Sequence, residues 1–484
     1  MSLDPQDWDA TRAVAHRMVD DMLDWLETVR ERPVWQPVPA EVKDRFASPV
    51  PRAGTDLATV YQRFTSDVLP YPTGNIHPRF WGWVMGTGSP TAMLAEMLAA
   101  GMNAHLAGYD QSAALVERQV LAWMRELVGF PADASALLVS GGSEANLNGL
   151  IAARVARAGF DVRMDGTHGG PQLTVYGSTE THSWVLKACE AMGLGRRAFR
   201  AIPVDGAFRI DLDAARARIL ADRGAGLRPF ALVGNVGTVN TAAVDDLHGL
   251  RDLADELGLW LHLDGAFGTL AALSDHRDLV AGQELADSLA FDLHKWGYLP
   301  YEIGVILTRD PEAQLAAFRA PSIGSPAYLR SAAEGIAVDT THFADRGLQL
   351  SRGFKALKAW MCLQEQGVDR IGEAIGRNID QARYLGALVD GHHGLERVSP
   401  VSMNIVCFRY APDGVPSDRL DALNRAILVQ LQVRGIAVPS QTVLGGRFAI
   451  RVCITNHRTE DADLDLLVGE TVRIGEELLA AGTA

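Results

Sequence analysis

Three segments of the chain place a residue that could do chemistry directly after a short apolar stretch. They are Lys295, Asp264 and the glycine-rich turn at 140–146, which reads SGGSEAN. A lysine amine can form a Schiff base, a buried carboxylate is costly unless a cation faces it, and the N–H groups at a helix N-terminus can bind a phosphate. Enzymes that use pyridoxal 5'-phosphate (PLP) need these three groups, so the combination suits a PLP site.

Each segment alone also has a plain structural interpretation. Ser143 could cap a helix after a simple turn, Asp264 could be a turn or capping residue, and Lys295 could be a surface lysine. The turn carries neither the GK[ST] of a P-loop nor a GxGxxG fingerprint. The order of the three segments favours PLP over these separate readings, with Lys295 lying 31 residues beyond Asp264.

The elements that must position these residues alternate between short apolar runs and helical stretches. This alternation is typical of βαβ units and a largely parallel sheet, in which ligands bind beyond the carboxyl ends of the strands. The predicted strands lie at 136–139, 173–176, 230–233, 259–263 and 303–307, and the predicted helices at 144–158, 211–223 and 245–257.

The two ends of the chain have a different character. Residues 6–30 predict an amphipathic helix, followed by a proline-rich arm. The apolar stripe of this helix could dock on its own chain or on a partner subunit. The last part predicts a small α+β domain, with helices at 370–388, 418–434 and 460–480 and strands at 404–409 and 448–454. We therefore expect an N-terminal helical arm over 1–75, a large cofactor domain over 76–370 and a small domain over 371–484.

Composition excludes several classes of protein. The 484 residues include 45 Lys and Arg and 59 Asp and Glu, so the chain lacks the basic surplus of a nucleic-acid binder. No uncharged apolar run approaches the ~20 residues of a membrane helix. The four cysteines are scattered without a CxxC pair, and the acidic N-terminus does not resemble a signal peptide. We expect a cytoplasmic protein with reduced thiols, no metal site and no membrane contact.

Taken together, these motifs resemble those of the PLP-dependent group II amino-acid decarboxylases, the family of aromatic-L-amino-acid and glutamate decarboxylases. The segment His294-Lys295-Trp296 resembles the lysine motif of the family, and 140–146 resembles its phosphate motif. Further matching stretches follow in order along the chain at 77–80, 181–183, 237–238, 328–329, 351–358 and 450–452. The resemblance implies the fold-type-I PLP-dependent transferase-like architecture, with a mostly parallel seven-stranded sheet, a small C-terminal α+β domain and a homodimer whose active sites lie at the interface. It also favours packing of the first helix on the partner subunit.

The resemblance assigns roles at the cofactor ring. It implies that Lys295 forms the Schiff base and that Asp264 pairs with the pyridinium nitrogen, which keeps the ring an electron sink. Ala266 would pack beneath the ring. His182 would stack over the opposite face and could also transfer a proton, although a loop histidine without a catalytic role is the alternative.

It also assigns the phosphate end of the cofactor and its neighbours. Gly142 and Ser143 would hold the phosphate, and Thr238 and His294 would be secondary cofactor contacts. Asp292, three residues before the lysine, fits part of the family.

Tyr328 has the largest consequence for the product. It lies in a stretch at 319–330 that is rich in Pro, Gly and Ser and predicts a mobile loop. The family places a loop tyrosine over the site to protonate the substrate at Cα, which gives the amine rather than an oxidised product. An aromatic anchor for the loop is the structural alternative.

The substrate side matches the family less closely. Trp83, His105 and Arg451 are candidate substrate contacts, with a surface ion pair as the alternative for Arg451. Gly353 stands where many relatives carry a second arginine. We expect decarboxylation of an L-amino acid, with an aromatic substrate favoured over glutamate or another acidic one. The alternatives are another PLP chemistry (aldehyde synthase, aminotransferase or carbon–carbon lyase) and a catalytically silent PLP-fold binding protein.

Overall fold

The computed structural model describes residues 2–319, 334–338 and 342–482. Contacts along the chain divide it into two compact units. Unit 1 comprises Met1–Trp83, Tyr384–Val398 and Cys407–Ala484, and unit 2 comprises Val84–Arg383 and Ser399–Val406. The division expected from the sequence, at 75/76 and 370/371, stays a prediction.

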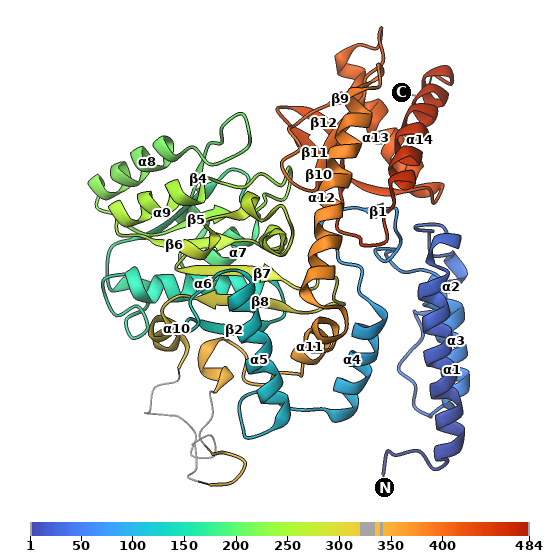
Figure 1. Ribbon diagram of the computed structural model, residues 1–484, viewed down its shortest axis with the longest axis horizontal. Helices are drawn as coiled ribbons and strands as arrows, with labels where there is room; N and C mark the ends of the chain where they lie inside the picture. Colours follow the sequence, from blue (N-terminus) through green and yellow to red (C-terminus); the bar gives the residue numbers. More distant parts are fainter. Residues whose placement is uncertain (1, 320–333, 339–341, 483–484) are drawn as a thin grey trace. The chain divides into compact units, whose positions relative to one another are not determined.

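A seven-stranded sheet forms the centre of unit 2 (Figure 1). Its strands are β2 (Ser135–Val139), β3 (Leu173–Ser178), β4 (Phe199–Ile202), β5 (Arg228–Asn235), β6 (Trp260–Asp264), β7 (Ser288–Asp292) and β8 (Gly304–Thr308). They lie in the order β2-β8-β7-β6-β5-β3-β4, and only β8 runs antiparallel to its neighbours. The carboxyl ends of the other six strands therefore share one edge. The predicted α/β class with a mostly parallel seven-stranded sheet is confirmed.

Helices supply the packing that these strands need, because parallel strands are apolar on both faces. The helices of this part of the chain are α4 (Pro90–Met102), α5 (Ser112–Leu127), α6 (Gly142–Arg157), α7 (Trp184–Ala191), α8 (Leu212–Gly224), α9 (Leu247–Glu256), α10 (Pro311–Phe318) and α11 (Ala356–Gln366). Helix α6 packs across β5 to β8 and against α7, while α8 and α9 lie side by side on β5 (Figure 1). The helix that follows β2 thus begins at the same edge where β6 and β7 end.

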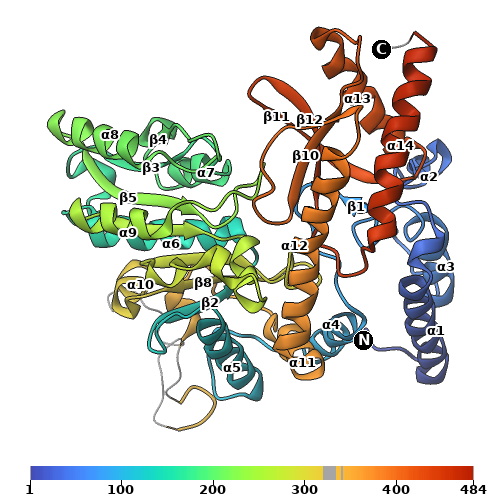
Figure 2. The same cartoon turned by 45° about the horizontal axis from the view of Figure 1, so that its top comes forward.

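A second sheet has five strands in the order β1-β11-β12-β10-β9. They are β1 (Phe80–Trp81), β9 (Leu395–Arg397), β10 (Ile405–Tyr410), β11 (Val438–Leu444) and β12 (Arg447–Cys453). Helices α13 (Ser417–Val433) and α14 (Asp461–Ala480) pack together beside it, and the long α12 (Val368–Asp390) precedes β9 in the chain (Figure 2). Strand β1, early in the sequence, pairs in parallel with β11. The predicted C-terminal α+β character is confirmed, and β1 is an addition that the sequence reading lacked.

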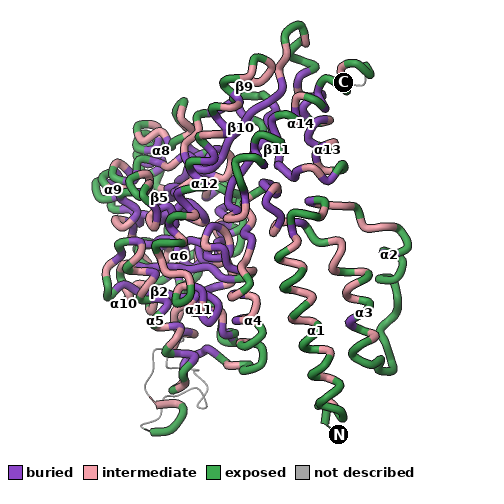
Figure 3. The backbone as a smooth tube through the Cα atoms, turned by 45° about the vertical axis from the view of Figure 1, so that its right-hand side comes forward, coloured by how far each residue is buried: buried purple, intermediate pink, exposed green. Residues whose placement is uncertain are grey.

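The N-terminal helices are α1 (Trp8–Glu27), α2 (Ala40–Arg45) and α3 (Leu57–Asp67). Helix α1 begins at the N-cap Asp7 and packs on α3, where the Tyr61 hydroxyl donates to Asp21 Oδ2 at 2.6 Å. No residue of α1 is buried within the single chain (Figure 3). Among the described residues, no helix has both the length and the apolar character needed to cross a membrane.

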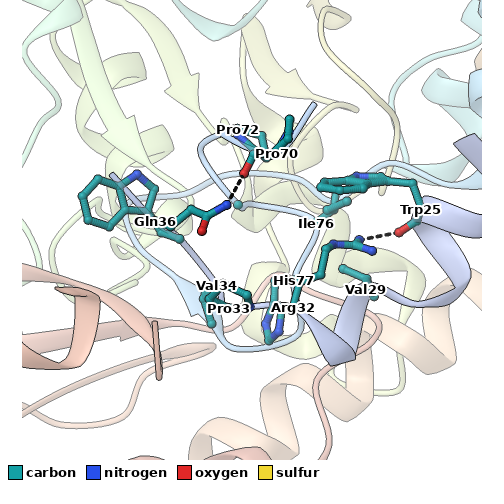
Figure 4. Close-up of a pocket in the computed structure, with 12 residues that line it drawn as sticks. Trp25, Val29, Arg32, Pro33, Val34, Gln36, Pro70, Pro72, Ile76 and His77 are labelled. Carbon is teal, nitrogen blue, oxygen red and sulfur yellow. Dashed lines mark hydrogen bonds between the residues drawn. The ribbon is translucent and has the colours of Figure 1, made fainter. Parts of the chain in front are cut away.

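Unit 1 also contains a cavity of about 120 Å³ where α1 ends and the chain turns back (Figure 4). Trp25, Val29 and the prolines at 33, 70 and 72 give it a mostly apolar lining. The Arg32 guanidinium lies over the Trp25 ring, and the Gln36 amide donates to Pro70 O at 2.9 Å. Its lining contains none of the site residues predicted from the sequence.

Candidate active site

The carboxyl edge of the seven-stranded sheet brings the three predicted segments together. Asp264 is the last residue of β6, and Asp292 is the last residue of the neighbouring β7. Lys295 follows β7 by three residues, and the turn after β2 leads into α6. The positions predicted from apolar runs alone therefore converge on one edge, as expected for a ligand site in an α/β fold.

Asp264 is buried and firmly held. The residue is only 6% exposed. Its Oδ2 accepts a hydrogen bond from the indole N–H of Trp184 at 2.5 Å. Its Oδ1 accepts from the backbone N–H of Ala266 at 3.1 Å. Among the described residues, no arginine or lysine lies at salt-bridge distance from Asp264. A buried carboxylate with two hydrogen-bond donors and no such partner is suited to meet a cationic ligand group.

A buried hydrogen-bond chain lies behind Asp264. His262 Nε2 is 2.7 Å from Asn146 Oδ1 on α6, and His262 Nδ1 is 2.8 Å from Ser288 Oγ on β7. The Trp260 indole donates to the same Ser288 hydroxyl. Burial lowers the pKa of His262 to about 4, so the ring is neutral at physiological pH. This chain fixes the start of α6 relative to β6 and β7.

Lys295 pairs with the carboxylate at the end of its own strand. Its Nζ lies 2.9 Å from Asp292 Oδ2, and the Asp292 side chain is 1% exposed. Burial acts to lower the pKa of Lys295, but the carboxylates of Asp292 and Asp264 outweigh it and leave the pKa raised. The lysine thus lies in the field of both strand-end carboxylates.

The ring of His294 lies in the same region as Lys295 and Asp292. Its Nδ1 accepts from the backbone N–H of Ile303 at 3.1 Å, and its ring centroid lies 4.5 Å from that of Tyr301. Burial lowers its pKa. Gly86 packs against this segment so closely that an added Cβ would lie 1.9 Å from the carbonyl oxygen of His294. The chain around Lys295 is therefore tightly confined.

The N-terminus of α6 forms the third part of the site. Gly141 is its N-cap in extended conformation, and Gly142 is its first residue. A Cβ at Gly142 would meet Asp292 Oδ2 at 3.0 Å and Ala266 Cβ at 3.5 Å, so the turn lies against both other segments. Ser143 is exposed. The free N–H groups and positive end of this 16-residue helix suit an anion.

His182 and Thr238 come from the loops after β3 and β5. His182 Nδ1 accepts from the backbone N–H of Trp184 at 3.2 Å. Burial lowers its pKa, Asp264 acts to raise it and Lys295 to lower it, so the ring lies within electrostatic reach of both. Thr238 is buried, with its hydroxyl 3.1 Å from Thr241 Oγ1.

The remaining predicted residues belong to other segments of the chain or fall outside the described residues. In unit 1 the Arg451 guanidinium donates to Trp83 O at 2.7 Å and to Ser440 Oγ at 3.1 Å. In unit 2 the His105 ring lies 6.0 Å from that of Tyr109. Tyr328 falls within 320–333, outside the described residues.

The residues that support Asp264 were not predicted from the sequence. Trp184 follows His182 by two positions, but nothing in its local sequence indicates that its indole reaches β6. Asn146, His262 and Ser288 lie in or near the quoted motifs without a predicted role. Within the described part of the chain, no group of three or more His, Cys, Asp or Glu side chains could hold a metal ion.

Comparisons with known proteins give a consistent result. A family model described as "Pyridoxal-dependent decarboxylase conserved domain" matches residues 39–411. The aromatic-L-amino-acid decarboxylase of Bacillus atrophaeus is 31% identical over 474 residues, covering 96% of each chain. The phenylacetaldehyde synthase of Arabidopsis thaliana is 29% identical over 475 residues, covering 95% of this chain and 94% of its own. The structure of Oryza sativa TDC with PLP and tryptamine is 26% identical, with a TM-score of 0.89 over 99% of this chain and all of the other.

Proposed function

Because the chain belongs to the pyridoxal-dependent decarboxylase family, we propose that it is a PLP-dependent carboxy-lyase that converts an L-amino acid to the amine and CO2. The observation that carries this proposal is the meeting of Lys295, Asp264 and the N-terminus of α6 at one edge of the sheet. Each supplies a different group that PLP needs: an amine, a buried carboxylate and an anion cradle.

The site fits this cofactor in its details. Gly142 leaves room where a Cβ would press closely on the Asp292 carboxylate, at 3.0 Å, and Ala266 presents only a methyl group beside it. Asp264 has two hydrogen-bond donors that orient its carboxylate. In the proposal Lys295 anchors the cofactor, Asp264 faces its ring nitrogen, and Gly142 and Ser143 hold its phosphate.

When bound, PLP supplies an electron sink for the electron pair left at Cα as CO2 departs. The residues of the chain then have separate tasks. Asp264 keeps a negative charge at the ring nitrogen, with its orientation fixed by Trp184 and Ala266. His182, Thr238 and His294 are proposed to confine the ring, and Tyr328 to return a proton to Cα.

We propose an aromatic amino acid as the preferred substrate. The support comes from the relatives, since one is an aromatic-L-amino-acid decarboxylase and the rice structure contains tryptamine. Trp83, His105 and Arg451 are the proposed substrate contacts. An acidic amino acid is the alternative. Oxidative aldehyde formation is a second candidate, favoured by the similarity to a phenylacetaldehyde synthase.

We propose further that two chains form a homodimer with active sites at the interface, and that the enzyme works in the cytoplasm. The homodimer is supported by the apolar stripe of α1, because no residue of this helix is buried within the single chain. The four buried cysteines, none in a disulfide, support the second point.

The experiment is a screen of the twenty amino acids with purified protein and PLP, following CO2, amine, aldehyde and peroxide. We expect CO2 and amine in equal amounts from an aromatic amino acid, and neither from Lys295→Ala. Aldehyde with peroxide in place of amine would support the synthase instead. Release of CO2 from none of the twenty would overturn the proposal.

A further inference from the structure

Asp292 is a buried carboxylate to which the proposed function gives no task. Its Oδ2 lies 2.9 Å from Lys295 Nζ and 3.6 Å from His294 Nε2. Its Oδ1 is buried and makes no hydrogen bond to any residue that the structure describes. A carboxylate with one paired and one unpaired oxygen is costly to bury, so its position calls for a specific purpose.

Glycines on two sides leave room for this carboxylate. A Cβ at Gly304 would lie 2.8 Å from Asp292 Oδ1, and a Cβ at Gly142 would lie 3.0 Å from Oδ2. Gly142 begins α6, so the Oδ2 atom is held at the positive end of that helix, which favours a negative charge. The surrounding backbone therefore accommodates the Asp292 carboxylate in the position where it pairs with Lys295.

The other titratable groups around Lys295 leave Asp292 as its main partner. Asp264 and Tyr301 also act to raise the pKa of Lys295, but by less than Asp292 does. His182 and His294 have lowered pKa values because they are buried, so both rings are neutral at physiological pH and add no positive charge. Among these groups only Asp292 forms a salt bridge with the lysine.

We propose that Asp292 is a positioning residue that keeps Lys295 charged and in place, and so sets the pH at which this lysine becomes a nucleophile. The proposal rests on the proposed function in one respect, that Lys295 is the lysine that binds PLP. Loss of the Nζ proton to a base in the solvent gives a neutral amine, while Asp292 stays a carboxylate. The amine lone pair then forms the C–N bond with the cofactor aldehyde carbon, and the aldehyde oxygen leaves as water with the two amine hydrogens.

The test is Asp292→Asn in the full-length protein after removal of PLP. PLP is added back at a series of pH values, and the growth of the visible absorbance band gives the rate of capture. In the wild type this rate rises as Lys295 loses its proton. We expect the midpoint of the rise to fall by one pH unit or more in the variant, which makes capture about tenfold faster at a pH below both midpoints. An unchanged or higher midpoint would overturn the proposal.

Glu302→Gln is the matched control. Glu302 lies ten residues beyond Asp292, and its carboxylate pairs with Lys355 at 3.2 Å instead of Lys295. We expect the wild-type midpoint in this variant. A shift as large as that of Asp292→Asn would show that any nearby carboxylate has the same effect and would overturn the specific role of Asp292.

A second measurement needs no variant and so does not depend on folding of Asp292→Asn. Competitive acetylation of the wild-type chain without PLP, read by peptide mapping, gives the titration of each lysine. Lys295 is expected to titrate above the ordinary lysine pKa of 10.5; titration at or below it would contradict the proposal. If the wild type captures no PLP, the proposed function fails. If it captures PLP and the pH midpoints of the wild type and Asp292→Asn agree, only the role of Asp292 fails.

Discussion

At the scale of single residues, the orientation of Asp264 depends on a donor from another element. The indole of Trp184, the first residue of α7, donates to Asp264 Oδ2 at 2.5 Å. A hydrogen bond to a charged group contributes about 1.5–3 kcal/mol. Trp184→Phe keeps the buried ring but removes the donor, so we expect PLP to bind about 10- to 100-fold more weakly. Absorbance titration with PLP measures the change.

Trp260→Phe provides the comparison for this prediction. Trp260 is as buried as Trp184, at 3% exposed, but its indole donates to Ser288 Oγ at 2.8 Å. We expect a much smaller loss of PLP affinity in this variant. Equal losses in the two variants would mean that packing, and not the bond to Asp264, explains the effect.

The residues that could be predicted from the sequence are those at strand ends. Lys295, Asp264 and Gly142 follow apolar runs, and the rule that ligands bind beyond the carboxyl ends of strands was enough to place them together. Trp184 could not be predicted in its role, because that role depends on where α7 lies relative to β6. The pair of Asp292 with Lys295 likewise needs the turn after β7 in three dimensions. Tyr328 stays a prediction.

At the scale of elements, the segment before α4 packs directly on the turn that carries Lys295. A Cβ at Gly86 would lie 1.9 Å from His294 O and 2.8 Å from Lys295 O. Backbone atoms cannot move aside as a flexible side chain can, so we expect Gly86→Ala to destabilise the fold by about 3 kcal/mol and to impair PLP binding. The urea midpoint measures the first effect.

Gly101→Ala is the control for the Gly86 variant. Gly101 lies in α4, and a Cβ there would meet no atom within 4 Å. Alanine favours a helix more than glycine does, so we expect an unchanged or slightly raised urea midpoint. A loss of stability as large as that of Gly86→Ala would contradict the close-packing explanation.

The buried hydrogen-bond chain through His262, which links α6, β6 and β7, predicts that the stability of the fold depends on pH. The pKa of His262 is about 4 in the folded protein because of burial, against an ordinary value of 6.5. Between these values the unfolded chain binds a proton that the folded chain does not, so stability is lost as the pH falls from 6.5 towards 4, by about 1.4 kcal/mol per pH unit at most.

Replacing the histidine tests this pH dependence. His262→Gln cannot titrate in this range, so its urea midpoint is expected to fall less steeply with acid than that of the wild type, although its stability at pH 7 is lower. An identical slope in the two proteins would exclude His262 as the source.

The elements themselves were largely predictable where they are long or strongly apolar. The strands predicted at 230–233 and 259–263 correspond to β5 and β6, and the helix predicted at 460–480 corresponds to α14. Strand β11 has no continuous apolar run, since its sequence VPSQTVL mixes polar residues with a proline. Strands β1 and β4 span two and four residues, too short for a periodic pattern.

At the scale of the whole molecule, the N-terminal arm predicts self-association. Leu23 on α1 and Val60 on α3 are exposed within the single chain, at 37% and 47%. We expect the double variant Leu23→Arg, Val60→Arg to shift the proposed dimer to monomer at micromolar concentration, because two charges per chain would have to be buried. Sedimentation velocity measures the shift, and activity should fall with it if the sites lie at the interface.

The control for this prediction is a charged substitution on unit 2. Leu220→Arg, on α8, replaces a leucine that is 49% exposed, and we expect it to leave the dimer intact. A wild type that sediments as a monomer at all concentrations would remove the basis of the prediction.

The proposed function depends on one covalent assignment, which can be measured directly. Borohydride reduction of the purified protein with PLP, followed by digestion and mass spectrometry, fixes the cofactor to the lysine that carries it. We expect a pyridoxyl group on the peptide that contains Lys295 and on no other lysine in comparable amount. A modified lysine elsewhere, or no modification at all, would contradict it.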